Sequence, residues 1–231
     1  MTPDFMAALE ATWPPAKTWE SGPWRLRDGA GGGKRVSAAT LAGDWGTDDL
    51  ATAEQAMAPN PLFMIRRGET PLDDALSAQG YRRIDPTLIY AATVLDMQAD
   101  LPPLACFPHW PPLEIARDLW AEGGIGPARL AVMDRVSGPK TAILARSHDR
   151  VAGVGFVACH GTVAMLHALE VAPAQRRRGA ARTILQAAAN WAAKRDAATL
   201  ALAVTEANSA ACALYTSLGM LVVGQYHYRQ R

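Results

Sequence analysis

One segment constrains the fold of this chain more than any other: Leu169 to Leu185, with the sequence LEVAPAQRRRGAARTIL. An apolar strand ends near Val171, Pro173 prevents further strand pairing, and Gly179 opens an Ala-rich helix. The first N–H groups of a helix lack intrahelical partners and the helix dipole is positive there, so such a turn readily binds phosphate. Gly179 would allow the ligand to approach the backbone closely. The segment therefore predicts a strand–turn–helix unit that binds a phosphate or pyrophosphate.

Three consecutive arginines, Arg176, Arg177 and Arg178, leave two other interpretations of this turn open. One is a solvated basic turn before an amphipathic helix, and the other is a nucleic-acid patch. A net charge of +1 and the lack of interleaved aromatic residues disfavour nucleic acid. The glycine at the start of the helix favours phosphate binding over both.

The C-terminal half predicts an α+β fold with a mixed sheet. The periodicity of apolar residues, and glycines that end helices, predict the following elements: helices over 114–122, 179–194 and 209–218, and strands over 141–146, 151–159, 162–171, 199–205 and 221–228. The first two strands would form a hairpin with its turn at His148–Arg150. The Gly-rich stretch 121–132 is expected to be a loop.

Five prolines between Leu101 and Pro112 predict a linker, which divides the chain into a lobe over 1–100 and a domain over 113–231. The sequence of the first lobe predicts strands over 35–41, 62–66 and 88–94, and helices over 48–57 and 72–79. Its helix end at 76–81, LSAQGY, parallels LYTSLGM at 214–220. The first lobe is therefore interpreted as a degenerate copy of the second, although a helix–Gly–strand joint is common enough to recur by coincidence.

Composition excludes several classes of protein. No apolar run reaches the roughly 20 residues of a membrane span, and the N-terminus lacks the pattern of a signal peptide. The three cysteines, Cys106, Cys159 and Cys212, show no metal-ligand or disulfide spacing. These features predict a cytoplasmic protein without a metal site.

Two sequence blocks resemble the GNAT superfamily of N-acetyltransferases. Arg176-x-x-Gly179-x-Ala181 is similar to the family's R/Q-x-x-G-x-G/A signature, preceded by an L-x-V-x-P strand end at 169–173. Residues 208–220, NSAACALYTSLGM, resemble the family's N-x-x-A…LY-x-x-x-GF block, with Met220 in place of the aromatic residue. The resemblance covers 113–231 and implies a GNAT fold, with a smaller GNAT-like lobe before it.

The resemblance implies a site for acetyl-CoA between two splayed strands. Its pantetheine arm would pair with the backbone near Leu169 and Val171, and its pyrophosphate would lie on the amides of 177–181. The cofactor-binding residues would be Leu169, Val171, Arg176, Arg177, Arg178, Gly179, Ala180, Ala181, Arg182 and Asn208. Asn208 could also simply cap the helix that follows it.

The resemblance also implies catalytic roles. Tyr215 would protonate the leaving thiolate, although an aromatic residue at this helical spacing could simply pack. Glu170 is the first choice for the base that deprotonates the amine, and a surface carboxylate paired with an arginine is the alternative. His167 and His227 follow, although a lone histidine on an apolar strand such as His167 is more often a satisfied core residue. Cysteine is not expected to act covalently, and Cys159 and Cys212 are interpreted as core residues.

The predicted function is direct transfer of acetyl from acetyl-CoA to a primary amine of a small molecule, amino acid or peptide. Arg129 could bind a carboxylate of such an acceptor or lie on the surface. The alternative is a non-catalytic acyl-CoA-binding or regulatory module. No nucleic-acid or membrane partner is expected, and the chain is expected to be a monomer or homodimer.

Overall fold

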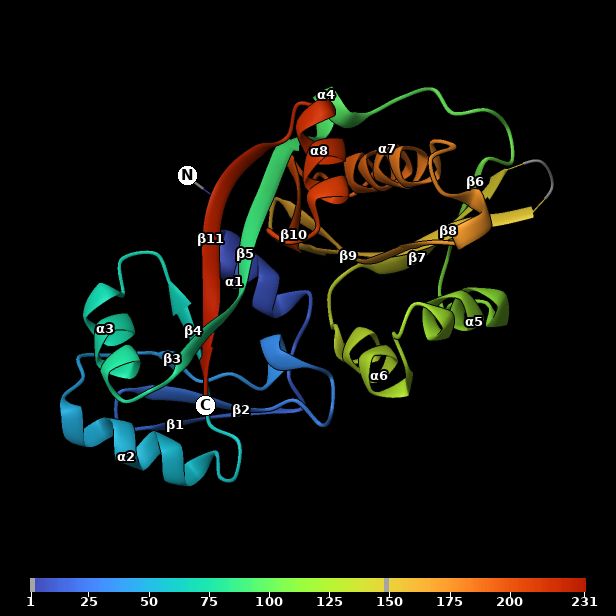
Figure 1. Cartoon of the computed structure of the whole chain (residues 1–231). Coiled ribbons are helices and arrows are strands. Elements are labelled where there is room, and N and C mark those ends of the chain that lie inside the picture. Colours follow the sequence, from blue (N-terminus) through green and yellow to red (C-terminus); the bar gives the residue numbers. More distant parts are fainter. Residues whose placement is uncertain (1–2, 148–149) are drawn as a thin grey trace.

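A computed structural model describes residues 3–147 and 150–231, so His148 and Asp149 of the predicted hairpin turn lie outside the described residues. An eight-stranded sheet with the order β4-β11-β5-β10-β9-β8-β7-β6 organises the molecule (Figure 1). Its strands are β4(Leu62–Arg66), β5(Arg82–Thr93), β6(Cys106–His109), β7(Lys140–Ser147), β8(Arg150–His160), β9(Val163–Val171), β10(Thr199–Thr205) and β11(Leu221–Gln230). A small second sheet contains β1(Lys17–Ser21), β2(Trp24–Asp28) and β3(Thr40–Leu41).

The C-terminal elements confirm the predictions closely. Helices α5(Glu114–Glu122), α7(Ala180–Ala193) and α8(Ser209–Ser217) and strands β7 to β11 lie where the periodicity expects them. Helix α7 begins after Gly179, whose φ of 88° is a left-handed conformation that glycine adopts without strain. Its buried face, which includes Ile184, Leu185 and Trp191, packs with apolar residues of β7 to β10 into one core cluster. This packing fixes the start of α7 against the end of β9.

Strands β5 and β11 join the two halves of the chain in one sheet. Strand β5, from the N-terminal half, lies between β10 and β11 and is antiparallel to both. Strand β11, the last of the chain, lies between β5 and β4. The last strand of each half therefore lies beside the second-last strand of the other half, β5 beside β10 and β11 beside β4. Figure 1 shows β5 and β11 running side by side through the molecule.

The N-terminal lobe repeats the order strand–helix–strand–helix–strand. Strand β3 is followed by α2(Thr47–Ala56), β4, α3(Thr70–Ala78) and β5, as β9 is followed by α7, β10, α8 and β11. A parallel bridge joins Ala39, directly before β3, to Phe63 on β4, as β9 is parallel to β10. The fold is thus mixed α+β, with a smaller N-terminal lobe whose elements follow the same order as those of the C-terminal lobe.

Several local predictions are wrong. Most of the strand predicted over 35–41 is the 3-10 turn η1(Lys34–Val36) and irregular chain, and only β3 is extended. The stretch 121–132, predicted as a loop, contains most of α6(Pro127–Arg135), because Pro127 is well placed at the first helical position. The sequence analysis did not identify β1, β2, α4(Val94–Met97) or α1(Phe5–Ala11), which Asp4 caps.

The Pro-rich segment 101–112 contributes a strand as well as a connection. Strand β6 pairs with β7 at the edge of the large sheet. An edge position tolerates Pro108, because proline cannot donate a hydrogen bond to a second neighbour. The segment thereby closes one edge of the sheet.

Strands β9 and β10 separate partway along their length. Their parallel pairing runs from Val163–Thr199 to Leu166–Leu202 and then stops. Beyond that point β9 stays with β8 and β10 stays with β5. Ala168, with φ of 50°, lies at an irregularity in the β8–β9 register that directs the end of β9 away from β10. The strands leave a wedge-shaped opening at the carboxyl end of β10.

In the described part of the chain, no helix combines the length and apolar character needed to cross a membrane.

Candidate functional site

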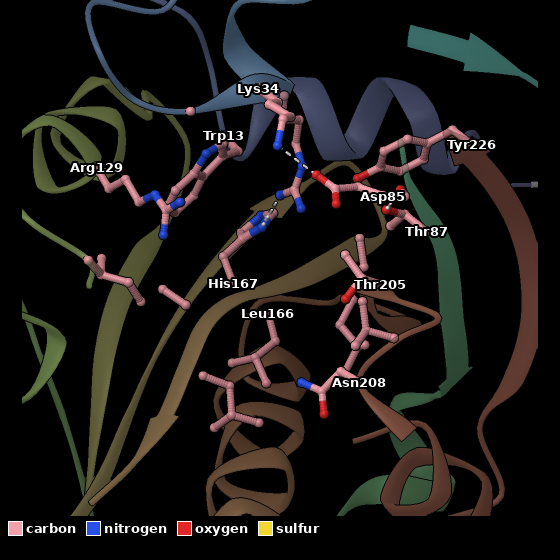
Figure 2. A pocket seen from close by; sticks show the side chains of 18 of the residues that line it. Trp13, Lys34, Asp85, Thr87, Arg129, Leu166, His167, Thr205, Asn208 and Tyr226 are labelled. Atoms are coloured by element: carbon pink, nitrogen blue, oxygen red, sulfur yellow. Dashed lines mark hydrogen bonds and ion pairs between the residues drawn. The ribbon is translucent and has the colours of Figure 1, made fainter. Parts of the chain in front are cut away.

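A cavity of about 400 Å³ occupies the opening between β9 and β10. Leu166, Leu169 and Leu202 line it on the face of the sheet that packs against α7 and α8. Tyr226 and Tyr228 line it on the opposite face, where they belong to a core cluster with α1. The cavity therefore connects the two faces of the sheet at the point where β9 and β10 separate. Figure 2 shows Leu166 and Asn208 at one end, with Lys34, Asp85 and Tyr226 at the other.

The turn from Arg176 to Gly179 has the shape expected of an anion-binding loop. The three arginines and Gly179 are exposed, and both Arg177 and Gly179 have a positive φ. Among the residues the structure describes, no hydrogen-bond acceptor is recorded for the N–H groups of 177–179. The first N–H groups of α7 likewise point out of the helix, and no side chain caps it. Ala180 and Ala181 add little bulk beside these donors.

Gln175 lies next to this turn and has an unusual environment. Its side chain is buried, and its Oε1 atom has no hydrogen-bond partner. Within the described residues only one other buried side-chain polar atom, Nε of Arg35, shares that property. Unpaired buried polar groups are rare and costly in folded proteins. Arg35 lines the cavity, whereas Gln175 lies beside the turn and outside the cavity lining.

Tyr215 projects from α8 toward the cavity. Its ring lies 5.5 Å from that of Tyr90, and the residue is almost completely buried. Burial, together with nearby Cys212, raises the pKa of the Tyr215 phenol to about 12. The phenol is therefore protonated at neutral pH and can donate a proton or a hydrogen bond into the cavity.

Glu170 lies outside the cavity lining. Its Oε1 atom is 3.3 Å from a terminal nitrogen of Arg176, whose Nε also donates to the carbonyl oxygen of Val171 at 3.2 Å. The carboxylate lies so close to Gly123 that an added Cβ there would be 2.7 Å from it. The predicted base is thus held by a predicted cofactor-binding residue, at the end of β9 and apart from Tyr215.

The remaining predicted cofactor residues divide between the cavity and the segment before and at the start of α7, which lies outside the cavity lining. Leu169 and Asn208 line the cavity, and Val171 pairs with Gly153 on β8. Asn208 also caps α8 by accepting a hydrogen bond from the N–H of Ala211 at 3.2 Å. Arg182 extends from the first turns of α7 to Ser217 at 3.5 Å.

The opposite end of the cavity contains a buried polar network. The sequence predicted a role for one of its members, His167, and for neither Arg35 nor Thr12. His167 is 5% exposed, with Nε2 2.8 Å from the Thr12 hydroxyl and Nδ1 3.2 Å from a terminal nitrogen of Arg35. Arg35 can only donate, so Nδ1 accepts and Nε2 carries the proton. Burial, and then the charge of Arg35, lowers the pKa of His167 well below its ordinary value. His167 is therefore neutral, with both ring nitrogens occupied.

Arg35 is the main cation of this end. Burial alone would lower the pKa of its guanidinium, but the neighbouring Tyr226 and Tyr228 phenols raise it. The pKa of Tyr228 is itself raised, chiefly by burial and by Tyr226, so that phenol is neutral. The sequence placed Arg35 at the start of the strand predicted over 35–41. No local pattern in the sequence marks it as a functional residue.

Other candidates lie elsewhere. The Nε2 atom of His227 is 2.7 Å from Asp73 on α3, on the side of β11 away from the cavity. Cys159 is buried in the core beside α7, and burial raises the pKa of its thiol to about 11. The described residues include no cluster of three or more metal-ligating side chains.

Comparisons with known proteins agree with this geometry. The sequence profile of the Acetyltransferase (GNAT) family matches residues 106–220. A GCN5-related N-acetyltransferase from Kribbella flavida is similar in structure, with a TM-score of 0.73 and 14% identity over 97% of this chain and 93% of that one. No curated protein shows significant sequence similarity to this chain.

Two further solved structures share the two-lobed fold. A conserved protein of unknown function from Staphylococcus epidermidis has a TM-score of 0.69 and 9% identity, over 95% of this chain and 94% of that one. A tandem GNAT protein from the clavulanic acid biosynthesis pathway has a TM-score of 0.63 and 14% identity, over 95% and 84%. At these identities the likeness establishes the fold. The likeness thus shows a GNAT fold preceded by a smaller GNAT-like lobe. The profile match shows that residues 106–220 belong to the acetyltransferase (GNAT) family, whose members transfer an acyl group from acyl-CoA.

Proposed function

We propose that the chain is an acetyl-CoA-dependent N-acetyltransferase that moves an acetyl group directly to a primary amine of a small molecule, amino acid or peptide. The observation that supports this most strongly is the cavity through the sheet, which joins Tyr215 on one face to a polar chamber on the other. Such a passage lets a thioester enter from the α7–α8 face while an amine approaches from the opposite face.

The donor subsite consists of the anion-binding turn and the opening between the strands. The pyrophosphate would lie on the amides of 177–181, with Arg176, Arg178 and Arg182 around it. The pantetheine arm would follow β9 past Val171 and Leu169, and Asn208 would border it.

The chemistry requires one base and one acid. The amine nitrogen attacks the thioester carbonyl carbon, a carbon–nitrogen bond forms and the carbon–sulfur bond breaks. Glu170 accepts the amine proton, through water because its carboxylate lies outside the cavity lining, and Tyr215 donates a proton to the departing thiolate. Solvent then returns a proton to Tyr215 and removes one from Glu170. The backbone N–H of Val171 is the proposed donor to the carbonyl oxygen.

Binding is tested by titrating acetyl-CoA into the protein and recording the melting temperature. A ligand that binds only the folded state raises the melting temperature with concentration. A millimolar concentration of acetyl-CoA that produces no shift would overturn the donor assignment. Dephospho-CoA and free pantetheine, run in parallel, separate binding by the phosphates from binding by the arm.

Transfer is tested by measuring release of free CoA over a panel of amines, amino acids and peptides. The proposal expects release with at least one acceptor and a product whose mass is increased by one acetyl group. Acetyl-CoA binding without transfer to any acceptor would favour a non-catalytic acyl-CoA-binding module. Where CoA release is detected, Tyr215→Phe and Glu170→Gln should lower it if the chain is the transferase, whereas unchanged release in both variants would favour the binding module.

A further inference from the structure

The chamber on the N-terminal side of the cavity has an uncompensated positive charge. Three cations line the cavity, Lys34, Arg35 and Arg129, against one carboxylate, Asp85. Lys34 already pairs with Asp85 at 2.8 Å. In the described part of the chain neither Arg35 nor Arg129 has a carboxylate partner. Two guanidinium groups therefore remain without a counter-ion.

Arg35 is more than a solvated surface charge. Its Nε atom is buried without a hydrogen-bond partner, and its neighbours His167 and Tyr228 are neutral. Arg35 as a whole is only partly buried, but a charge that is partly removed from water and has no opposite charge beside it is unfavourable. An anion that enters the chamber would supply both the missing charge and the missing acceptor.

We infer that this chamber, which we name the Arg35 subsite, binds the free carboxylate of an amino-acid acceptor. The inference rests on the proposed function and adds the acceptor's chemical class to it. A guanidinium offers two parallel N–H donors that match a carboxylate, and such pairs are short and strong. The Tyr226 and Tyr228 phenols beside Arg35 can donate to the same group.

The position of Arg35 limits how far the amine lies from the carboxylate. Arg35 contacts His167, which directly follows Leu166, the last residue of β9 paired with β10. The acetyl group must reach the opening that begins at this point. An acceptor whose carboxylate is on Arg35 therefore has its amine only a few bonds away, as in an α-amino acid or a short ω-amino acid.

Arg129 stands at the entrance of the same chamber. It lies on α6, and the nearest atoms to an added Cβ at Gly33 are those of its guanidinium, 3.7 Å away. Figure 2 shows its side chain extending toward Trp13 and the interior of the cavity. Because the residue is exposed, Arg129 would attract the carboxylate while Arg35 holds it. An exposed charge contributes less than a buried one, so its expected effect is smaller.

The decisive experiment compares each acceptor with partners that lack the carboxylate. The panel contains α-amino acids and β-alanine, each beside its decarboxylated amine and its carboxamide, with phosphoethanolamine as a phosphate-bearing probe. CoA release and melting temperature are measured for every compound in the presence of acetyl-CoA. We expect transfer and stabilisation with amino acids, and at least a tenfold lower kcat/KM for the amines and carboxamides.

Arg35→Gln should raise KM for the amino acid about tenfold or more while leaving KM for its decarboxylated amine unchanged. Arg67→Gln, at an exposed arginine outside the cavity, is the matched control and should change neither. Arg129→Gln gives a second reading at an exposed position, where a smaller rise in the same direction is expected. If Arg35→Gln does not fold, the Arg129→Gln variant and the compound panel together decide the result.

Each outcome separates the inference from the proposed function. Equal transfer to amines with and without a carboxylate would retain the acetyltransferase and overturn the Arg35 subsite. A preference for phosphoethanolamine would show that the anion is a phosphate and would overturn the carboxylate assignment. Stabilisation by amino acids without any CoA release would support the subsite and refute the transferase. If amino acids neither raise the melting temperature nor accept an acetyl group, the Arg35 subsite is overturned.

Discussion

Arg176 holds Glu170 by a contact of 3.3 Å between a guanidinium nitrogen and the carboxylate. The same arginine also donates to the carbonyl oxygen of Val171. Arg176 occupies the first position of the R/Q-x-x-G-x-G/A motif, where the family resemblance assigns it to the pyrophosphate. If the pyrophosphate attracts Arg176, Glu170 loses its partner. Binding of the donor would thus release the carboxylate proposed as base.

Arg176→Gln should weaken acetyl-CoA binding by about tenfold, since it removes one charge-assisted contact to the pyrophosphate at an exposed position. Calorimetric titration of acetyl-CoA measures the effect, with Arg67→Gln as the control. The affinity for pantetheine alone should not change. An equal loss of affinity for pantetheine would place the contact away from the phosphates.

Tyr215→Phe should reduce kcat by at least about 10²-fold, the usual contribution of general acid catalysis. Its dissociation constant for acetyl-CoA should change little, because the ring still packs beside Tyr90. Tyr90→Phe is the matched control, since it removes a neighbouring phenol that does not line the cavity. Comparable losses in both variants would mean that the pair acts through packing.

The pH profile gives an independent reading of Tyr215. Because burial raises the pKa of its phenol to about 12, the acid form should persist through the alkaline range. Activity should therefore show no fall assignable to Tyr215 between about pH 8 and 10.5. Steady-state rates across this range test the point. A descending limb near pH 10 that disappears in Tyr215→Phe would contradict it.

Cys159→Ala should leave acetyl transfer intact and lower the free energy of unfolding by about 1 kcal/mol, because it removes a buried sulfur from the core. Burial raises the pKa of this thiol to about 11, so the nucleophilic thiolate is scarce at neutral pH. Iodoacetamide should not inhibit the native enzyme by reaction at Cys159. A covalent acetyl-enzyme isolated from native protein and absent from the variant would contradict direct transfer.

The sequence predicted the C-terminal elements well because each depends on short-range signals. The apolar run of β10 predicted its bounds at Thr199 and Thr205, and Gly179 marked the start of α7. The anion-binding turn needed only the strand, the turn and the helix in order. These features are local, so periodicity and the positions of Gly and Pro were enough to find them.

The Arg35 subsite could not be predicted in the same way because it is assembled from distant segments. Arg35 meets His167 across 132 positions of sequence, and Tyr226 reaches them from the last strand. Strand pairing between β5 and β10 or β11 leaves no mark in either strand's own pattern. The sequence of β9 likewise carries no sign that Glu170 faces Gly123 instead of the cavity.

Deleting residues 1–100 should prevent the C-terminal lobe from folding, although the family match lies within the remainder. Strand β11 would lose both neighbours, β4 and β5, and β10 would lose one. The exposed strand edges would favour aggregation. Circular dichroism and thermal unfolding of residues 101–231 test this, with the full chain as the reference. A cooperative transition in the fragment would show that the lobe is an independent domain.

His167 should make the protein less stable as the pH falls below about 6.5. Its pKa is lowered well below the ordinary value in the folded state, so below that ordinary value the unfolded chain binds a proton that the folded chain does not. The free energy of unfolding should then fall by up to about 1.4 kcal/mol per pH unit from this residue. Urea unfolding at pH 7.5 and pH 5 measures the loss, and His167→Gln should reduce it. His160→Gln, at an exposed position, should retain the native pH dependence, and an equal loss in all three proteins would mean that another group is responsible.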